Sequence, residues 1–336
     1  MGYTNINIKS TGAYIPTHRV KNDELIEHFA KMDLKVDGLM KAMNKEVRYF
    51  CENGETSIDM GHEAALMAID RSNITRNDID MIIFVSAQPE YLNPTTAMEL
   101  RLLLKANNAH VVFDMNDTCL GGASAINIAS KYMMSSDDVN NALIISAQNI
   151  SAVVDKSDTV AYSLMSDCGV ALLLQKEEED VKRGYINSVN YCRGAYVSNI
   201  KFPHCGLSKA LSNQNIPLTT RERNYTWESF PIEWLGRDFG HSIGRLLVKC
   251  GIKNDDVDLC FLSQFTRKGV EQGLELEGIP VEKNIYIGDK YGYTGPTSPI
   301  LALHWGFNEG LVKEGQNIII GSLGTGINTC TMLFKF

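Results

Sequence analysis

The sequence lacks the features that mark several large classes of protein. No apolar run reaches the roughly 18 to 20 residues that span a membrane, and the N-terminus has no basic segment followed by an apolar one. Lysine and arginine number 32 against 40 aspartate and glutamate residues, which gives a formal net charge of −8. Nucleic acid binding requires a basic surface that this balance does not supply. We therefore expect a cytosolic protein that binds neither nucleic acid nor a membrane.

Paired cysteines are also missing. The eight cysteines stand at positions 51, 119, 168, 192, 205, 250, 260 and 330, and no two of them form a Cys-x-x-Cys pair. This scatter argues against a zinc site and favours reduced thiols over a disulfide framework. We expect no bound metal and no resident cofactor.

The apolar residues that are present follow an alternating pattern of strands and helices. Of the 336 residues, 44% are hydrophobic, which is enough for two domains or one large one. Residues 81–86 and 142–146 are continuous apolar runs, as in strands of a parallel sheet. Residues 56–70 and 95–105 have helical spacing. The alternation predicts an α/β fold.

The order of these elements recurs in the second half of the chain. The segment from Ile74 to Ser86, a capped turn that leads into an apolar strand, is echoed from Ile252 to Ser263. Further matches pair 95–105 with 267–277, the segment around Cys119 with 284–295, and 142–146 with 317–321. A repeat of roughly 180 residues predicts two similar βαβαβ halves. We place them at residues 1–180 and 181–336, with the charged run 176–180 as a solvated loop at the boundary.

Cys119 stands between an apolar strand and a helix that opens on small residues, Gly121 to Ser124. A thiol in the first turn of a helix lies beside unpaired N–H groups and the positive end of the helix dipole, which lower its pKa and favour the reactive thiolate. The small residues leave room for a thioester to approach. Cys119 is therefore the candidate nucleophile for acyl transfer, and the alternative is a small buried hydrophobic side chain.

Sites in parallel sheets form beyond the carboxyl ends of the strands. In each half of the chain, a strand or turn ends at residues whose side chains can act in catalysis or binding. We expect Cys119, Ser263 with Gln264, Tyr293 and the Gly321–Gly326 turn to lie around one cavity.

At these residues the sequence resembles the thiolase superfamily, most closely its β-ketoacyl-ACP synthase III branch. The resemblance rests on Asp114-x4-Cys119-x-Gly, on Ser166 to Ala171 and on the glycine-rich segment Leu323 to Gly326. It implies a five-layered αβαβα fold, a homodimer, and a cysteine that takes an acyl group from coenzyme A or acyl carrier protein. In that family a malonyl-carrier is then decarboxylated and condensed with the acyl group.

The resemblance also implies an oxyanion hole and shows a departure from the family. The two backbone donors would be the amides of Cys119 and Thr325, where Thr325 replaces a third glycine. The family's catalytic His and Asn correspond to Ser263 and Tyr293. Removing one oxyanion donor typically costs about 2.7 to 4 kcal/mol, so we expect impaired decarboxylation with acyl loading retained. Both side chains can donate hydrogen bonds, but neither is a good base at neutral pH.

A second departure concerns the acyl donor. The family stacks the adenine of coenzyme A between a Trp and an Arg, and the corresponding segment 37–48 has neither in place. Lys41 and Lys45 remain candidates to contact phosphates or the acidic surface of a carrier protein, with an exposed helix face as the alternative. We expect carrier-bound acyl donors in preference to free coenzyme A.

Three hypotheses follow from these residues. The first is an acyltransferase that loads an acyl group onto Cys119 and passes it to an acceptor in fatty-acid-like or secondary metabolism. The second is a decarboxylating synthase in which Ser263, Tyr293 or water replaces the usual donors. The third is a catalytically weak partner subunit of a heteromeric condensing enzyme, and the retained cysteine argues against it.

Overall fold

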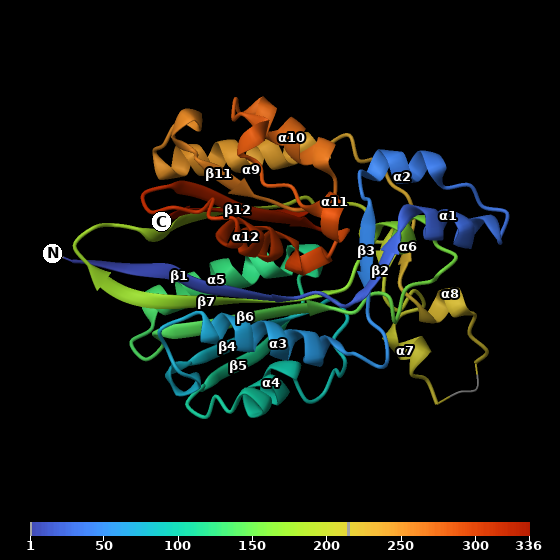
Figure 1. Ribbon diagram of the computed structural model, residues 1–336, viewed down its shortest axis with the longest axis horizontal. Helices are drawn as coiled ribbons and strands as arrows, with labels where there is room; N and C mark the ends of the chain where they lie inside the picture. The colour runs from blue at the N-terminus through green and yellow to red at the C-terminus, as the bar shows by residue number, and fades with distance from the viewer. Residues whose placement is uncertain (1, 214–215) are drawn as a thin grey trace.

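Two stacked sheets enclose a central pair of helices, and further helices cover the outer face of each sheet (Figure 1). This arrangement comes from a computed structural model, which describes residues 2–213 and 216–336. The five layers confirm the expected αβαβα fold. Helices α5 and α12 lie between the sheets, α3 and α4 cover one outer face, and α9 and α10 cover the other.

The first sheet is formed entirely by residues of the N-terminal half, in the order β1-β7-β6-β4-β5. Strand β4 pairs in parallel with both β5 and β6, while β7 is antiparallel to β1 and β6. Every residue of β4 and β6 is buried, which explains why these strands are continuous apolar runs. The elements of this half are β1 (Tyr3–Tyr14), α3 (Ser57–Asp70), β4 (Met81–Val85), α4 (Thr96–Leu104), β5 (Val111–Met115), α5 (Gly121–Ser135), β6 (Asn141–Gln148) and β7 (Cys168–Glu179).

The second sheet repeats this plan with residues of the C-terminal half, in the order β11-β12-β13-β8. Strands β11 and β12 are parallel, and β13 is antiparallel to β12 and β8. Helix α12 corresponds to α5 and lies beside it in the central layer. The elements are β8 (Gly184–Cys192), α9 (Leu235–Cys250), β11 (Leu259–Phe261), α10 (Arg267–Leu276), α12 (Ser298–Asn308), β12 (Asn317–Gly324) and β13 (Asn328–Lys335).

The strand expected at the start of segment 284–295 is reduced to a single parallel bridge between Cys260 and Asn284. After Ile285, backbone N–H groups of this segment donate hydrogen bonds to a side chain instead of to a neighbouring strand. The Gln264 side-chain oxygen accepts hydrogen bonds from the N–H groups of Ile287 and Gly288, at 2.7 and 3.1 Å. The side chain thus satisfies groups that a strand ladder would otherwise pair.

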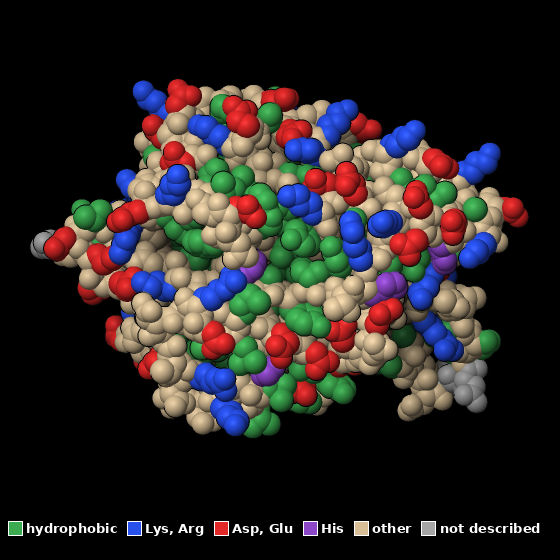
Figure 2. All heavy atoms as spheres, viewed as in Figure 1, with side chains coloured by type: hydrophobic (Ala, Val, Ile, Leu, Met, Phe, Trp, Pro, Cys, Tyr) green, Lys and Arg blue, Asp and Glu red, His purple; other side chains and the backbone are tan. Residues whose placement is uncertain are grey.

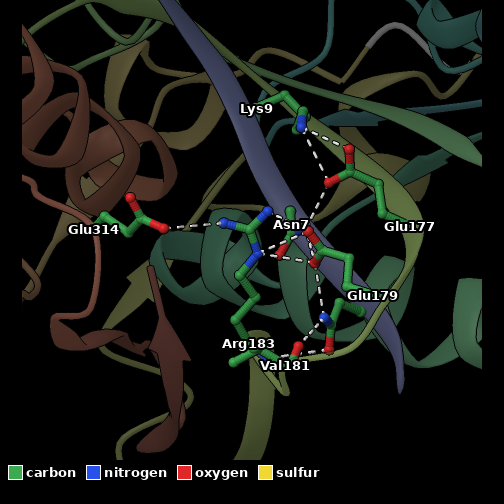
Figure 3. A network of polar contacts seen from close by, with 8 residues as sticks. Asn7, Lys9, Glu177, Glu179, Val181, Arg183 and Glu314 are labelled. Atoms are coloured by element: carbon green, nitrogen blue, oxygen red, sulfur yellow. Dashed lines mark hydrogen bonds and ion pairs between the residues drawn. The ribbon is translucent and has the colours of Figure 1, made fainter. Parts of the chain in front are cut away.

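The charged run 176–180 is not the solvated loop that we expected, because strand β7 continues through Glu179. Its carboxylates are paired with neighbours from β1 and from the start of the second half (Figure 3). Glu177 accepts from Lys9 at 2.9 Å and from Asn7 at 2.6 Å, and Glu179 pairs with Arg183. These partners allow a run of like charges to remain in a strand.

The remaining elements gather at one end of the layers, on the right in Figure 1. They are β2 (His18–Lys21), α1 (Asn22–Ala30), α2 (Asp37–Met43), β3 (Val47–Phe50), α6 (Thr159–Leu164), β9 (Ile200–Lys201), α7 (Leu207–Ala210), α8 (Thr220–Arg223), β10 (Thr226–Trp227) and α11 (Gly288–Tyr291). Among the helices of the described residues, none is both long and apolar enough to cross a membrane. On the face seen in Figure 2, acidic and basic side chains are interspersed around hydrophobic ones that gather near α12 and β1.

Candidate active site

Cys119 lies in a single 3₁₀ turn, Thr118–Leu120, which joins strand β5 to helix α5. Asp114 in β5 accepts hydrogen bonds from the N–H groups of Thr96 and Ala97, at 2.8 and 2.7 Å. The carboxylate thereby holds the start of α4 against the strand that leads to the cysteine. Thr118 has a φ of 48°, in the left-handed region that β-branched residues rarely occupy. The turn is therefore strained immediately before the thiol.

The small residues after Cys119 allow α5 to pack closely against the start of α12. A Cβ atom added at Gly122 would lie 2.2 Å from the carbonyl oxygen of Pro296, and one at Gly121 would lie 2.5 Å from Val85. Backbone contact at this distance leaves space only for hydrogen. The glycines thus place the nucleophile turn of one half directly against the corresponding turn of the other half.

Burial dominates the electrostatics of the Cys119 thiol. The side chain is 8% exposed, and this burial raises the pKa of the thiol, partly offset by a hydrogen bond from Tyr293 and by its own backbone N–H. We expected the helix terminus to lower the pKa, and that expectation is wrong for the protein without substrate. Removal of the thiolate from water outweighs the local donors.

Tyr293 lines the same cavity as Cys119, whereas Ser263 and Gln264, which we also expected there, are buried outside the wall of that cavity. The Tyr293 hydroxyl lies close enough to the Cys119 thiol that each side chain shifts the pKa of the other, and Ser263 also acts on the pKa of Tyr293. Its backbone is held in place by bonds from Tyr293 N–H to Leu164 and from Ser166 N–H to Tyr293, both at 3.0 Å. Burial, followed by the charge of Cys119, raises the pKa of Tyr293 far above its usual value, so this hydroxyl acts as a donor and not as a base.

The second expected oxyanion donor is already engaged. The Thr325 N–H donates to the hydroxyl of Thr118, with 3.2 Å between nitrogen and oxygen. Thr325 lies in the turn between β12 and β13, and Gly324 beside it leaves room for the Thr118 side chain. The turn therefore reaches Cys119 as predicted, but its amide points to a neighbouring hydroxyl in this state.

Aromatic rings fill most of the cavity above Cys119. The cavity has a volume of about 20 Å³, and aromatic side chains make up much of its wall: Tyr196, Trp227, Phe230, Trp234, Phe265 and Tyr293. Tyr225 is also buried and belongs to the same hydrophobic cluster as Cys119, but it does not line this cavity. Except for Tyr293, these aromatic residues played no part in the prediction of the site from sequence. The sequence does contain a signal for this aromatic wall, namely a segment unusually dense in aromatic residues: Tyr225, Trp227, Phe230 and Trp234.

The two candidate lysines have different positions. Lys41 is exposed on helix α2. Lys45 is 1% exposed, so the expectation that it contacts phosphates or a carrier protein is wrong. Its ammonium nitrogen bonds the carbonyl of Gln264 at 2.5 Å and the hydroxyl of Tyr286, and burial, with Arg48 nearby, lowers its pKa well below the usual value. The aliphatic stem of Lys45 is enclosed because the chain turns inward after α2 to form β3.

No residue set in the described ranges suits a metal ion, since no three His, Cys, Asp or Glu side chains cluster there. The eight cysteines are all free thiols.

His304 is the histidine nearest in sequence after Tyr293. Its ring forms hydrogen bonds with Thr11 at 3.1 Å and with Asn308 at 3.0 Å, so it helps to hold α12 against β1. Burial lowers its pKa to about 4.

Known proteins resemble this chain in sequence and in fold. Residues 113–194 match the family model for 3-oxoacyl-[acyl-carrier-protein] synthase III, and residues 247–336 match the model for its C-terminal region. A β-ketoacyl-[acyl-carrier-protein] synthase III of Neisseria gonorrhoeae is 26% identical over 329 residues, covering 98% of both chains. The corresponding protein of Aliarcobacter butzleri is 27% identical over 334 residues, covering 98% of this chain and 97% of the relative.

Solved structures show the same fold over the whole chain. The 3-oxoacyl-[acyl-carrier-protein] synthase III of Aquifex aeolicus superposes with a TM-score of 0.85 at 24% identity, covering 99% of this chain and all of the other. OleA of Xanthomonas campestris, with cerulenin bound, superposes with a TM-score of 0.77 at 16% identity, covering 100% of both chains. Together with the two matched segments, the first of which contains the nucleophile turn, these similarities support the 3-oxoacyl-ACP synthase III family, with its thiolase-like fold, for this chain.

Proposed function

We propose that the protein is an acyltransferase of the synthase III type, which takes an acyl group onto Cys119 and transfers it to an acceptor with little or no decarboxylation of malonyl-carrier. The observation that carries this proposal is the set of groups around the thiol. Cys119 is retained at the strand–helix junction, the side chain beside it is that of Tyr293, and Ser263 lies next to Tyr293. This set can hold an acyl thioester but supplies no imidazole for the decarboxylation step.

The proposed loading step needs only the thiol and hydrogen-bond donors. The Cys119 sulfur attacks the carbonyl carbon of the donor thioester, and a new carbon–sulfur bond forms as the bond to the donor sulfur breaks. The donor leaves as a thiol with the proton that Cys119 gave up. Tyr293 is placed to donate to the reacting sulfur, and the Cys119 amide lies beside it. Developing negative charge on the carbonyl oxygen requires such donors.

We propose a carrier-bound donor in preference to free coenzyme A. The relatives named above are synthases of the acyl-carrier-protein type. With Lys45 buried, Lys41 is the one of the two candidate lysines left to contact an acidic carrier. A single exposed lysine supplies a weak, salt-sensitive contact. We therefore propose a carrier interface that includes α2 and extends beyond it.

We further propose a homodimer through the edge of the first sheet. Strand β5 is the edge strand, and all five of its residues are only half-buried. Helix α4 beside it exposes Met98 by 52%, Leu102 by 74% and Leu103 by 45%. An apolar surface next to an open strand edge favours pairing with another chain. A second copy of the chain at the same edge would pair with the open strand β5 and cover the apolar side chains of α4.

The experiment is intact-protein mass spectrometry of the full chain after incubation with acyl-carrier and acyl-coenzyme A donors, followed by malonyl-carrier with detection of carbon dioxide. We expect one acyl adduct at Cys119 and no carbon dioxide above background. Cys119→Ala abolishes the adduct, whereas Cys51→Ala, which alters a free thiol outside the cavity, retains it. Carbon dioxide with a ketoacyl product would instead establish a decarboxylating synthase. Absence of any adduct would favour a partner subunit.

A further inference from the structure

Five aromatic rings stand in nearly parallel planes along the cavity that contains Cys119. Phe265 and Trp227 have centroids 5.4 Å apart and planes inclined by 19°. Trp227 and Phe230 follow at 6.3 Å and 2°, and Phe230 and Trp234 at 6.3 Å and 18°. Tyr196 completes the row, at 5.4 Å and 19° from Phe230. All five line the same cavity as the thiol.

Phe230 contacts three of the other four rings and is less buried than either tryptophan. Its ring lies between Trp227 on one side and Tyr196 with Trp234 on the other. It is half-buried and belongs to an irregular segment between β10 and α9, whose neighbouring residues 228, 229 and 231 are exposed. Trp227 and Trp234, by contrast, are each 8% exposed. Phe230 can therefore leave the row while the two tryptophans remain.

An acyl group on Cys119 requires a side chain of the cavity wall to move. The cavity holds about 20 Å³, close to the space needed by one water molecule. Rotation of Phe230 away from the cavity leaves a slot between Trp227 on one side and Tyr196 with Trp234 on the other, whose rings are nearly parallel to that of Phe230. A planar ring fills this slot and restores the stacking that Phe230 gave up, whereas a saturated chain or ring of equal size restores only apolar contact.

We propose that the acyl group accepted by Cys119 carries an aromatic ring, which replaces Phe230 between Trp227 and Trp234. This inference rests on the proposed acyl loading of Cys119 and adds the chemical class of the substrate. The aromatic acyl group passes from the sulfur of the donor to the sulfur of Cys119, and the donor departs as its thiol with the Cys119 proton. Stacking on two faces gives an aromatic acyl group a preference of roughly two- to tenfold over its saturated counterpart.

The test compares matched acyl thioesters of N-acetylcysteamine as donors to the full-length protein. One pair is benzoyl and cyclohexanecarbonyl, and the other is 3-phenylpropanoyl and 3-cyclohexylpropanoyl, which places the ring further from the sulfur. Acetyl serves as the general loading donor. The rate of Cys119 adduct formation is measured by intact mass, and the aromatic-to-saturated ratio within each pair is the readout. This ratio is independent of how much of a variant preparation is folded.

We expect a ratio above two in at least one pair for the wild-type protein. Trp227→Leu should bring that ratio close to one, while Phe230→Ala, which opens the slot in advance, should raise the absolute rate for the aromatic donor. Trp305→Leu is the matched control, since Trp305 lies on α12 against Lys290, outside the cavity, and this variant should keep the wild-type ratio.

Ratios near one in both pairs for the wild-type protein would overturn the aromatic proposal, as would an unchanged ratio in Trp227→Leu. The acetyl donor separates this result from failure of the proposed function. If acetyl loads onto Cys119 while the aromatic donors show no preference, the acyltransferase proposal stands and the substrate class is wrong. If neither acetyl nor any other donor loads, both proposals fail.

Discussion

The backbone N–H of Thr325 donates a hydrogen bond to the hydroxyl of Thr118, although the two residues are 207 positions apart in the chain. The bond ties the turn between β12 and β13 to the strained residue before Cys119. A thioester oxygen that uses the Thr325 amide must displace the Thr118 hydroxyl. The resting protein therefore holds one of its two expected oxyanion donors in a competing bond.

Replacing the Thr118 hydroxyl with a methyl group should speed acyl loading. A typical hydrogen bond contributes about 0.5 to 1.5 kcal/mol, so its removal in Thr118→Val corresponds to a roughly two- to tenfold faster adduct rate at Cys119. Valine keeps the branched side chain, so the backbone strain is unchanged. Thr118→Ser retains the hydroxyl and should load at the wild-type rate. A slower Thr118→Val would mean that the hydroxyl itself assists the acyl group.

The pH dependence of Cys119 reactivity should reflect its burial. Because the folded thiol has a pKa above its ordinary value of 9.0, the thiolate fraction and the alkylation rate should still be rising at pH 9. Tyr293→Phe removes the hydrogen bond that lowers this pKa, so its rate profile should move to higher pH. The rates are measured with iodoacetamide and assigned to Cys119 by peptide mass. A plateau below pH 8 in the wild-type protein would contradict the role of burial.

Placing His at position 263 and Asn at position 293, the side chains that the family resemblance implies there, should raise decarboxylation if the present side chains are what limits it. The double variant Ser263→His with Tyr293→Asn should release carbon dioxide from malonyl-carrier roughly 10²-fold faster than the wild-type protein, the scale of one oxyanion donor. Each single variant should give less, because the two side chains act on the same oxygen. No gain in a double variant that still loads an acyl group would show that the rest of the cavity has diverged.

The pair of Glu179 and Arg183 should stabilise the protein at neutral pH and lose its effect in acid. The hydrogen bond from Arg183 lowers the pKa of Glu179 from 4.5 to about 2 (Figure 3). The contribution is therefore complete above pH 4.5 and disappears as the pH falls toward 2. The pair is partly exposed, so Glu179→Gln should cost no more than about 1 kcal/mol at pH 7.

Thermal unfolding at two pH values checks this assignment. We expect Glu179→Gln to lower the Tm by roughly 1 to 2 °C at pH 7 and to match the wild-type protein near pH 2.5. Glu178→Gln is the control, because Glu178 is exposed on the other face of the strand and bonds the Thr4 hydroxyl instead. An equal effect of both substitutions would assign the change to net charge and not to the pair.

A charge on the exposed face of α4 should disrupt the proposed dimer. We expect the wild-type protein to elute with twice the chain mass of 37.3 kDa and Leu102→Glu to elute as a monomer. The measurement is size-exclusion chromatography with light scattering. Val248 on α9, 84% exposed, provides a matched apolar position, and Val248→Glu should remain dimeric. A wild-type monomer would contradict the interface at β5.

The sequence by itself determined the order of strands and helices, the two-fold repeat and the position of Cys119 between β5 and α5. These features depend on the local spacing of apolar, small and capping residues, which the chain expresses within each segment. Of the residues expected around the cavity, Tyr293 and the turn of Thr325 lie there, which follows from the repeat because carboxyl ends of parallel strands share one edge, while Ser263 and Gln264 do not line it.

Only the tertiary structure decided how these groups are used. Lys45 has the sequence context of an exposed lysine, yet the packing of distant segments encloses it. The charged strand end at Glu179 depends on partners in β1, and the aromatic row depends on rings from three separate segments. The Thr118–Thr325 bond and the raised pKa of Cys119 likewise come from contacts between the two halves. Burial and long-range contacts set these properties, and a local pattern of residues does not encode them.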